Sequence, residues 1–298
     1  MNTTLPANRP RVGVIGLGIM GSAMSTNLIT AGFDLFGYDP VAAARQRLRK
    51  SGGQACKNIS DVTHNTQHLV LSLPSESALD QVCLELLATG HKGLIAAETS
   101  TLPEACKLRN KNMLARHGMT LLDCPLSGTG AQAVNRDLAV YASGNAKAIK
   151  SMHRVFDGFA RVRYDVGDFG NGMRMKLVAN LLVAIHNVSS AEAILMGARA
   201  GLDPATIVKV VADGAGGSRM LQVRGPTMVN RSWENATMKV STWQKDMKLI
   251  TEALAASNTP APTFAACQGI YNAAMGSGHA DHDTAAVYAV LKRMSSKK

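Results

Sequence analysis

The chain has 298 residues, of which 46% are hydrophobic and 18% charged, a composition typical of a globular protein of one or two domains and not of a disordered or fibrous one. It contains no run of about 18 uncharged apolar residues, so we expect no membrane span. The net charge of +11 is spread evenly, with 18 basic and 13 acidic residues up to position 168 and 14 and 8 beyond it. This distribution argues against a nucleic-acid partner and is compatible with attraction of small anions.

The N-terminal segment and the cysteines bear on the cellular compartment. Residues Met1 to Arg9 lack the apolar core of an export signal, and we expect a short frayed leader. The five cysteines are Cys56, Cys83, Cys106, Cys124 and Cys267. Their odd number and scattered spacing favour the reducing cytoplasm, where cysteines pack as small hydrophobic side chains. We therefore predict a cytoplasmic protein in which Cys124 is buried and structural.

A glycine-rich turn follows the first predicted strand, residues 11–15, and precedes a helix that ends near Ala31. The turn consists of Gly16, Leu17, Gly18, Ile19, Met20 and Gly21. Gly16 permits a tight turn, Gly18 lets the backbone approach a phosphate, and Gly21 lets the helix lie close to the strand. The N–H groups at the start of the helix then face an anion. The strand–turn–helix order predicts a dinucleotide site.

Asp39 ends the second predicted strand, residues 34–38. A carboxylate in this place accepts hydrogen bonds from the ribose hydroxyls and repels a 2′-phosphate, so we predict NAD as the cofactor in preference to NADP. Basic residues on the next helix offer the alternative of holding that phosphate; they are Arg45, Arg47, Arg49 and Lys50. We interpret them as a solvated helix face, because none directly follows Asp39.

The rest of the chain separates into an alternating part and a helical part. Further strands are predicted at 68–73, 93–97, 119–123 and 138–142, with helices at 75–88 and 103–117. This alternation predicts an α/β fold with a doubly wound parallel sheet of Rossmann type. Helices alone are predicted afterwards, at 173–200, 204–213, 243–256, 263–275 and 284–294. We expect a dinucleotide-binding domain at 1–168 and an all-helical domain at 169–298, joined by the long helix.

Two segments end strands at the carboxyl edge of the sheet, where ligands of doubly wound sheets bind. Leu73 and Pro74 end the third predicted strand, and Thr101 follows the fourth. The Thr101 hydroxyl in this place either contacts the nicotinamide of a dinucleotide or caps the next helix.

The segment after the fifth predicted strand, residues 123–130, contains Ser127, Gly128 and Thr129. Glycines next to hydroxyl side chains leave backbone N–H groups free to bind a carboxylate. A simple tight turn would have the same composition. On spacing alone the two interpretations are equally good.

Lys176 and Asn180 lie four residues apart near the start of the long helix, so they share one helix face. A lysine among so many apolar residues either extends its amine to solvent or uses it in a site; the pattern alone favours the first. Lys245 begins a later helix beside Asp246, and a solvated charge pair is the simple interpretation.

The sequence offers little support for other site chemistries. His279, Asp281, His282 and Asp283 have metal-ligand character, but they lie on a turn before the last helix, where Asp283 is better interpreted as a helix cap. We therefore expect no metal site. Neither the G-x-S-x-G nor the H-E-x-x-H pattern of hydrolases occurs.

Taken in order, these motifs resemble the β-hydroxyacid dehydrogenase family, which includes 3-hydroxyisobutyrate dehydrogenase, tartronate semialdehyde reductase and 6-phosphogluconate dehydrogenase. The matching segments are 16–24, 73–74, 100–101, 123–128, 170–180 and 245–246. The resemblance implies a Rossmann domain followed by a helical domain, with the active site between them. It also implies hydride transfer between NAD(P) and a small 3-hydroxy acid or the matching semialdehyde.

The resemblance assigns roles to single residues. Lys176 corresponds to the catalytic lysine and Asn180 to the asparagine that orients the substrate. Ser127, Gly128 and Thr129 occupy the loop that binds the substrate carboxylate. The implied cofactor contacts are Gly16, Gly18, Ile19, Met20, Gly21, Asp39, Leu73, Pro74, Thr101 and Lys245. A lysine with the ordinary pKa of about 10.4 is a poor base at neutral pH, so this role needs surroundings that disfavour the charge.

Two departures from the family pattern bear on the substrate. Thr129 takes the place of a glycine, and residues 216–219 lack the aromatic that often follows the serine. Both are expected to alter the far end of the pocket. Because no additional arginine cluster for a sugar phosphate is evident, we predict a small anionic acid of three or four carbons.

The resemblance also implies a homodimer or homotetramer. Two other functions are compatible with such a fold: a non-catalytic dinucleotide-binding sensor or scaffold, and imine reduction. Both are disfavoured because Lys176, Asn180 and the carboxylate loop are retained.

Overall fold

The computed structural model describes residues 9–295, so only Arg9 of the expected leader is described. The chain divides into two compact units, Met1–Lys176 (unit 1) and Leu177–Lys298 (unit 2). The boundary predicted after residue 168 lies just before the long helix, whereas the two units divide inside that helix.

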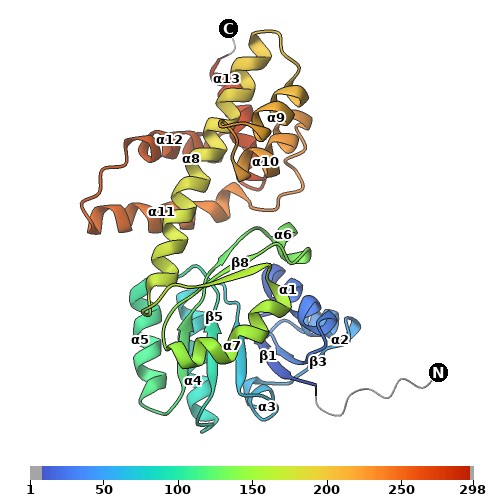
Figure 1. The fold of residues 1–298 in the computed structure, drawn as a ribbon, viewed down its shortest axis with the longest axis vertical. Helices are drawn as coiled ribbons and strands as arrows, with labels where there is room; N and C mark the ends of the chain where they lie inside the picture. The colour runs from blue at the N-terminus through green and yellow to red at the C-terminus, as the bar shows by residue number, and fades with distance from the viewer. Residues whose placement is uncertain (1–8, 296–298) are drawn as a thin grey trace, which may run out of the picture. The chain divides into compact units, whose positions relative to one another are not determined.

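Unit 1 alternates strands and helices, as Figure 1 shows from blue to green. Its strands are β1 Arg11–Ile15, β2 Asp34–Tyr38, β3 Gln54–Ala55, β4 His68–Leu71, β5 Ile95–Glu98, β6 Thr120–Asp123, β7 Leu126–Ser127, β8 Ala139–Ala142 and β9 Val162–Asp165. Its helices are α1 Ile19–Thr30, α2 Ala42–Lys50, α3 Ile59–Thr63, α4 Glu76–Ala88, α5 Glu104–Ala115, α6 Gly130–Val134 and α7 Ala146–Phe159.

The main sheet has six parallel strands in the order β3-β2-β1-β4-β5-β6. The chain moves outward from β1 in both directions, so the strand order reverses between β1 and β4. Ligands of open α/β sheets bind at the carboxyl ends of the strands beside such a reversal. The predicted doubly wound fold is confirmed, and the glycine turn after β1 lies at this point.

Both faces of the sheet are buried, which explains the continuous apolar character of the strands. Side chains alternate between the two faces along each strand. In β4, for example, Val70 packs into the cluster formed with α1, α2 and α7, whereas Leu69 and Leu71 pack into the cluster formed with α3, α4 and α5.

The strand predicted at 138–142 exists as β8, but it does not join the main sheet. It pairs antiparallel with β7 and parallel with β9 in a separate three-stranded sheet. The sixth strand of the main sheet is the two-residue β3, which the sequence analysis missed. Edge strands this short carry too few residues for a period-2 pattern to be recognised.

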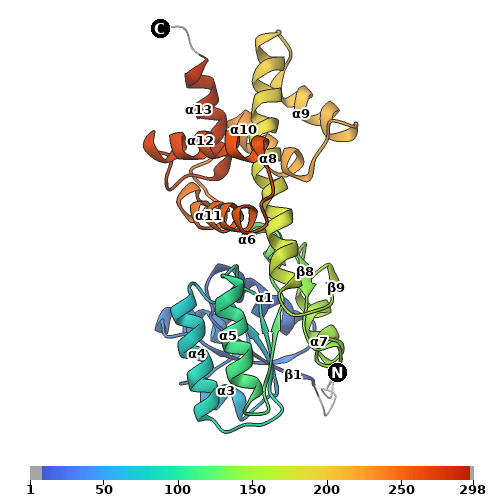
Figure 2. The ribbon, with the colours of Figure 1, turned by 90° about the vertical axis from the view of Figure 1, so that its left-hand side faces the viewer.

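The regular elements of unit 2 among its described residues are helices, apart from an isolated bridge between Lys239 and Asp283 (Figure 2). Its helices are α8 Asn171–Arg199, which begins in unit 1, then α9 Pro204–Asp213, α10 Arg219–Asn230, α11 Val240–Ala256, α12 Pro262–Gly276, the short 3-10 helix η1 Thr284–Ala286 and α13 Val287–Met294. The core gathers around α8, where Ala184, Val188, Ala191 and Ile194 are buried against the other helices.

Helix α8 is the one helix among the described residues that is long and apolar enough to cross a membrane by length and composition. In its most apolar 18-residue stretch, 39% of the residues are buried inside the protein. The central helix of a protein core passes the same test, and α8 provides the centre of the unit 2 core.

Candidate active site

The glycine turn of unit 1 has the geometry that its sequence predicts. Gly16 has a φ of 90°, and a Cβ there would lie 2.1 Å from the Ser72 carbonyl oxygen. A Cβ on Gly21 would lie 1.9 Å from the carbonyl oxygen of Gly16. Both contacts are far inside van der Waals distance, so the turn and the close packing of α1 require glycine at these two positions.

Gly18 is different, because a Cβ at this position would meet no atom within 4 Å. It is the N-cap residue of α1, where no side chain caps the helix and the first turn contains no acidic residue. Ile19, next to it, is 79% exposed. The N-terminus of α1 therefore presents backbone N–H groups and the positive end of the helix without a protein acceptor in front, which fits the pyrophosphate of a dinucleotide.

Asp39 is buried at the end of β2 and holds the glycine turn. Its Oδ2 accepts the N–H of Leu17 at 2.7 Å, and its Oδ1 accepts the N–H of Val41 at 2.8 Å. Each oxygen retains a second lone pair that can accept a hydroxyl. Arg45 donates to the Asp39 carbonyl oxygen at 2.5 Å and to the Pro40 carbonyl oxygen at 3.0 Å, so its guanidinium is bound to the backbone.

The loops after β4 and β5 are tied to each other. Ser100 Oγ accepts the N–H of Leu73 at 2.8 Å, which places the Leu73–Pro74 segment beside Thr101. The N-cap of α5 is Pro103, and no side chain caps this helix. The capping interpretation of Thr101 is therefore wrong, and Thr101 is a half-buried residue at the carboxyl edge of the sheet.

The predicted carboxylate loop begins with β7. Gly128 has a φ of 136°, and a Cβ there would lie 2.6 Å from a Leu138 methyl group, so this position requires glycine. Thr129 forms a capping box with Gln132: its Oγ1 accepts the Gln132 N–H at 3.4 Å, and its own N–H donates to Gln132 Oε1 at 3.0 Å. The threonine that departs from the family pattern thus starts α6.

Lys176 and Asn180 lie on the buried face of α8. Buried residues recur on this face at the spacing of a helix stripe: Met173, Lys176, Asn180, Ala184, Asn187, Ala191 and Ile194. Lys176 is 9% exposed and Asn180 is 3% exposed. The expectation that the Lys176 amine extends to solvent is therefore wrong, because the apolar residues that suggested it, such as Val178 at 59% exposure, lie on the other face.

Asn180 has a carboxylate partner within unit 2. Its Nδ2 donates to Asp246 Oδ2 at 3.0 Å, and Asp246 is 6% exposed. Lys245 Nζ lies 3.8 Å from Asp246 Oδ1, with the lysine side chain half-exposed. Asp246 is thus a buried partner of a predicted site residue, and the sequence analysis missed it; the only signal was its position next to Lys245. Nδ2 carries two N–H groups, so besides the bond to Asp246 it can donate a second hydrogen bond to the oxygen of a hydroxyl.

Two other predictions concern single residues. Cys124 is fully buried, as expected, and burial raises the pKa of its thiol. Asp283 caps η1, because its Oδ1 accepts the N–H of Ala285 at 3.0 Å. Burial alone would raise the pKa of Asp283, but the nearby Arg224 guanidinium and backbone N–H donors outweigh it and lower that pKa. Its oxygens are therefore occupied by a structural role.

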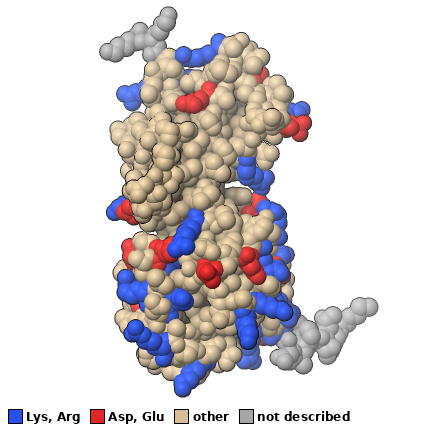
Figure 3. All heavy atoms as spheres, turned by 60° about the vertical axis from the view of Figure 1, so that its left-hand side comes forward, with Lys and Arg blue, Asp and Glu red and all other residues tan. Residues whose placement is uncertain are grey.

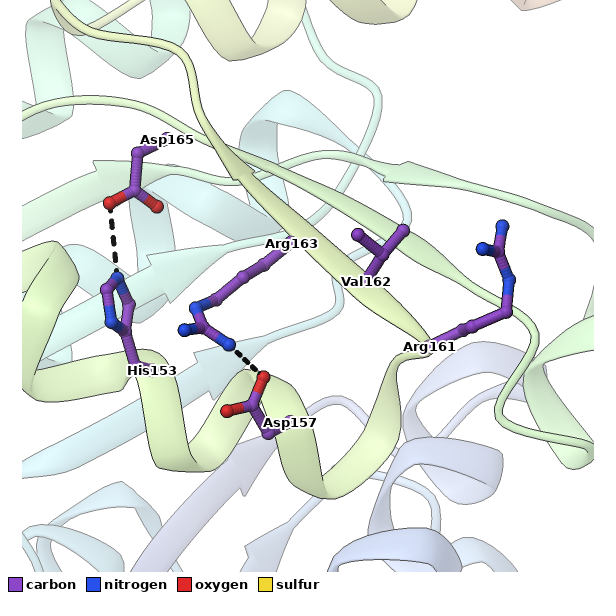
Figure 4. A pocket seen from close by; sticks show the side chains of 6 residues that line it. All are labelled: His153, Asp157, Arg161, Val162, Arg163 and Asp165. Carbon is purple, nitrogen blue, oxygen red and sulfur yellow. Dashed lines mark hydrogen bonds and ion pairs between the residues drawn. The ribbon is translucent and has the colours of Figure 1, made fainter.

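An open pocket of about 350 Å³ lies between α7 and β9 (Figure 4). None of the predicted site residues lines it. Its polar side chains contact one another or a neighbour: His153 Nε2 lies 3.1 Å from Asp165 Oδ2, Arg163 pairs with Asp157, and Arg161 pairs with Asp137 at 2.9 Å.

The geometry of β1, its glycine turn and Asp39 defines a dinucleotide-binding protein. Comparison with known families agrees. The model described as the NAD binding domain of 6-phosphogluconate dehydrogenase matches residues 11–200. The model described as the NAD-binding domain of NADP-dependent 3-hydroxyisobutyrate dehydrogenase matches residues 170–291.

Individual relatives can be aligned with nearly the whole chain. Glyoxylate/succinic semialdehyde reductase 2 of Arabidopsis thaliana is 29% identical over 100% of this chain and 85% of its own length. L-threonate dehydrogenase of Cupriavidus necator is 28% identical over 94% and 95% of the two chains. The crystal structure of a Salmonella typhimurium 3-hydroxyisobutyrate dehydrogenase matches with a TM-score of 0.84 and 26% identity, covering 94% and 99%. An imine reductase from a Pseudomonas species shares the fold at a TM-score of 0.55 and 16% identity.

The chain belongs to the β-hydroxyacid dehydrogenase family. Its reaction class is accordingly NAD(P)-dependent oxidoreduction, and imine reductases are distant neighbours in fold.

Proposed function

We propose that this protein oxidises a small 3-hydroxy acid with NAD, or reduces the matching semialdehyde, with Lys176 as general acid and base. The observation that carries the proposal is the place of Lys176. Its amine belongs to a side chain that is 9% exposed, on the same buried helix face as Asn180. A lysine withdrawn from water on a buried helix face is expensive to retain without a use.

Lys176, Asn180 and Asp246 have different roles in the proposed reaction. NAD supplies the hydride acceptor when it is bound. Lys176 takes the proton of the substrate hydroxyl during oxidation and returns it during reduction. The second N–H of Asn180 Nδ2 donates to the oxygen of that hydroxyl and holds it in line, and Asp246 keeps the amide in this orientation through its 3.0 Å hydrogen bond with Nδ2.

The carboxylate end of the substrate is assigned to the loop after β7. The Ser127 hydroxyl and the Gly128 N–H would bind the two carboxylate oxygens. We assign Thr129 to the same substrate loop, and its capping box with Gln132 fixes the shape of the loop. Arg136, which has a φ of 56°, donates to the Asp157 carbonyl oxygen at 2.6 Å and thus binds the C-terminal part of α7.

Most of the residues that we assign to the cofactor lie at the carboxyl edge of the main sheet. Backbone N–H groups at Gly18, Ile19 and Met20 would bind the pyrophosphate, in a turn shaped by Gly16 and Gly21. Asp39 would accept the ribose hydroxyls. The nicotinamide would lie beside Leu73, Pro74 and Thr101, and Lys245 completes the predicted contacts.

A panel of acids tests the reaction and its substrate class. It contains 3-hydroxyisobutyrate, L-serine, L-threonate and 6-phosphogluconate, each with NAD and with NADP, and NADH absorbance is recorded. We expect a three- or four-carbon acid to have a kcat/KM about tenfold or more above that of 6-phosphogluconate, because no arginine cluster serves a phosphate. Preference for the sugar phosphate would contradict the substrate class, and cofactor binding without turnover of any member would favour the sensor alternative.

Asp39→Asn tests the choice of NAD over NADP. The change removes a charged acceptor for the ribose hydroxyls, so we expect the Kd of NADH to rise about tenfold or more and the Kd of NADPH to fall. Fluorescence titration with NADH and NADPH measures both. Asp34→Asn, the same chemical change at the start of β2, serves as the control and leaves both constants unchanged. Tighter binding of NADPH than NADH by the unchanged protein would contradict the assignment.

We further propose a cytoplasmic homodimer or homotetramer. The exposed side of α8 carries Met175, Val178, Leu182 and Met196, with exposures from 42% to 73%. On the face shown in Figure 3, much of the surface of unit 2 carries neither basic nor acidic side chains. The exposed apolar side of α8 is typical of an interface. All five cysteines are free thiols, which is compatible with the cytoplasm.

A further inference from the structure

A buried charge cluster in unit 1 has no part in the function proposed above. Lys107, on α5, is 0% exposed, and its Nζ lies 2.7 Å from Glu98 Oε2 and 2.7 Å from Asp123 Oδ1. Both carboxylates are also 0% exposed. Burial alone would lower the pKa of Lys107, but the two carboxylates outweigh burial and raise it, so the amine keeps its charge.

The Glu98 side of this cluster leads to the loops assigned to the cofactor. Glu98 Oε1 accepts the N–H of Ser100 at 2.9 Å, and Ser100 Oγ in turn accepts the N–H of Leu73 at 2.8 Å. Two hydrogen bonds therefore connect the charge cluster with the segments that contain Thr101 and Pro74.

The Asp123 side leads to the start of α8. Asp123 Oδ2 accepts the N–H of Met173 at 2.7 Å and the hydroxyl of Ser143 at 3.2 Å. Ser143 Oγ also accepts the N–H of Gly172 at 3.0 Å. These N–H groups belong to the first turn of α8, where a carboxylate is favoured by the helix dipole. Lys176 follows Met173 by three residues, about one turn along the helix.

Lys107 is the only cation paired with these two carboxylates among the described residues. Without its charge, Glu98 and Asp123 would remain buried side by side with no counter-charge. One of them would then take up a proton or move, because two buried carboxylates at close range disfavour double ionisation. Either response disturbs the acceptor on which the first turn of α8 depends.

We propose that Lys107 is a positioning residue of the active site: through Asp123 it fixes the first turn of α8, and thereby the place of the Lys176 amine, and through Glu98 it fixes the cofactor loops. This inference rests on the role proposed for Lys176. Lys107 itself touches neither substrate nor cofactor in this scheme.

A double-mutant cycle tests the proposal. Lys107→Met removes the charge at similar volume, and displacement of a reacting group by about 1 Å is expected to lower kcat about 10²-fold. If Lys107 acts through Lys176, the same change lowers kcat less than about threefold in a Lys176→Ala background. The assays use NAD and the fastest acid of the panel above.

Amide hydrogen exchange provides a readout that needs no ligand. In Lys107→Met we expect the amides of Gly172 and Met173 to exchange about tenfold faster or more, because their acceptors are disturbed. Arg224→Met is the matched control: it breaks another buried ion pair, Arg224 to Asp283 at 3.2 Å in unit 2. It is expected to lower the melting temperature without changing exchange at these two amides or the kcat of the folded protein.

The outcomes separate the two proposals. Near-normal turnover of Lys176→Ala alone overturns the proposed function and, with it, the route from Lys107 to catalysis. A large loss in Lys176→Ala together with equal losses for Lys107→Met in both backgrounds overturns the positioning role only. Unchanged exchange at Gly172 and Met173 in Lys107→Met also overturns it.

Ser143→Ala provides the test if Lys107→Met does not fold. It leaves no charge unpaired and removes the acceptor of the Gly172 N–H. We expect kcat to fall about fivefold, as for one lost hydrogen bond, with no further loss in the Lys176→Ala background. Wild-type kcat and wild-type exchange at Gly172 would overturn the proposal.

Discussion

Lys176→Ala lowers kcat about 10²–10⁴-fold while the Kd of NADH changes less than about threefold. The reason is that alanine cannot exchange a proton with the substrate hydroxyl, whereas the groups assigned to the pyrophosphate and ribose lie on β1, α1 and β2. Steady-state kinetics and NADH fluorescence titration measure the two quantities. The control is Lys248→Ala, which removes an exposed lysine, 77% accessible, from α11.

Chemical rescue makes this expectation more specific. If the missing group is an amine that transfers a proton, methylamine added to Lys176→Ala restores part of the lost rate, and the restored rate increases with the concentration of the free base. Near-wild-type turnover in Lys176→Ala would remove this residue from the mechanism. A large increase in the Kd of NADH would show instead that Lys176 serves in binding.

The second large expected effect concerns Gly18 and Gly21 in the glycine turn between β1 and α1. Gly21→Ala places a Cβ 1.9 Å from the Gly16 carbonyl oxygen, and we expect it to destabilise unit 1 by about 3 kcal/mol or more. Gly18→Ala places a Cβ where no protein atom lies within 4 Å, so its stability is expected to stay within about 0.5 kcal/mol of the unchanged protein.

For NADH affinity the expectation differs from that for stability, because Gly18→Ala is the variant that affects binding directly. Gly18→Ala is expected to raise the Kd of NADH about tenfold or more, because its methyl group occupies the approach to the N–H groups of α1. Thermal unfolding and NADH titration on both variants check the pair of effects. Normal NADH affinity in Gly18→Ala would contradict the assignment of the pyrophosphate to this turn, whatever the stability of Gly21→Ala.

The parts of the fold that follow from local patterns could be predicted from the sequence. Strands β1 and β2 begin and end at the predicted residues, and α9 does so as well. In each case the apolar pattern and the glycine, proline or aspartate signals that bound the element are adjacent in the chain. The glycine turn is recognised in the same way, because its three glycines lie between an adjacent strand and helix, although its packing also involves Asp39 and Ser72 at the ends of other strands.

The partition of strands between two sheets could not be predicted in this way. The residues of β8 have the apolar character of a buried strand, but its partners β7 and β9 have two and four residues, and half of β9 is exposed. Pairing of such short strands depends on contacts between distant parts of the chain. Hydrophobic periodicity carries no information about these contacts.

The contacts that the site residues and Lys107 make with distant residues also could not be predicted from the sequence. Lys107 lies among Glu104, Arg109 and Lys111 on a helix of mixed charge, a pattern typical of a solvated face. Its burial results from Glu98 and Asp123, which come from two different strands. Asn180 and Asp246 are 66 residues apart and meet only through the packing of α8 and α11. Separations of this kind leave no periodic signal.

The buried charges around Lys107 constrain how this sequence can change. Losing one of the three mutually compensating ions leaves the others without a counter-charge and costs about 3–5 kcal/mol. A triple replacement by apolar side chains would avoid the unpaired charge but would leave the N–H groups of Met173 and Ser100 without their carboxylate acceptors. The three positions are energetically coupled, so substitutions at Lys107, Glu98 or Asp123 should be interpreted together.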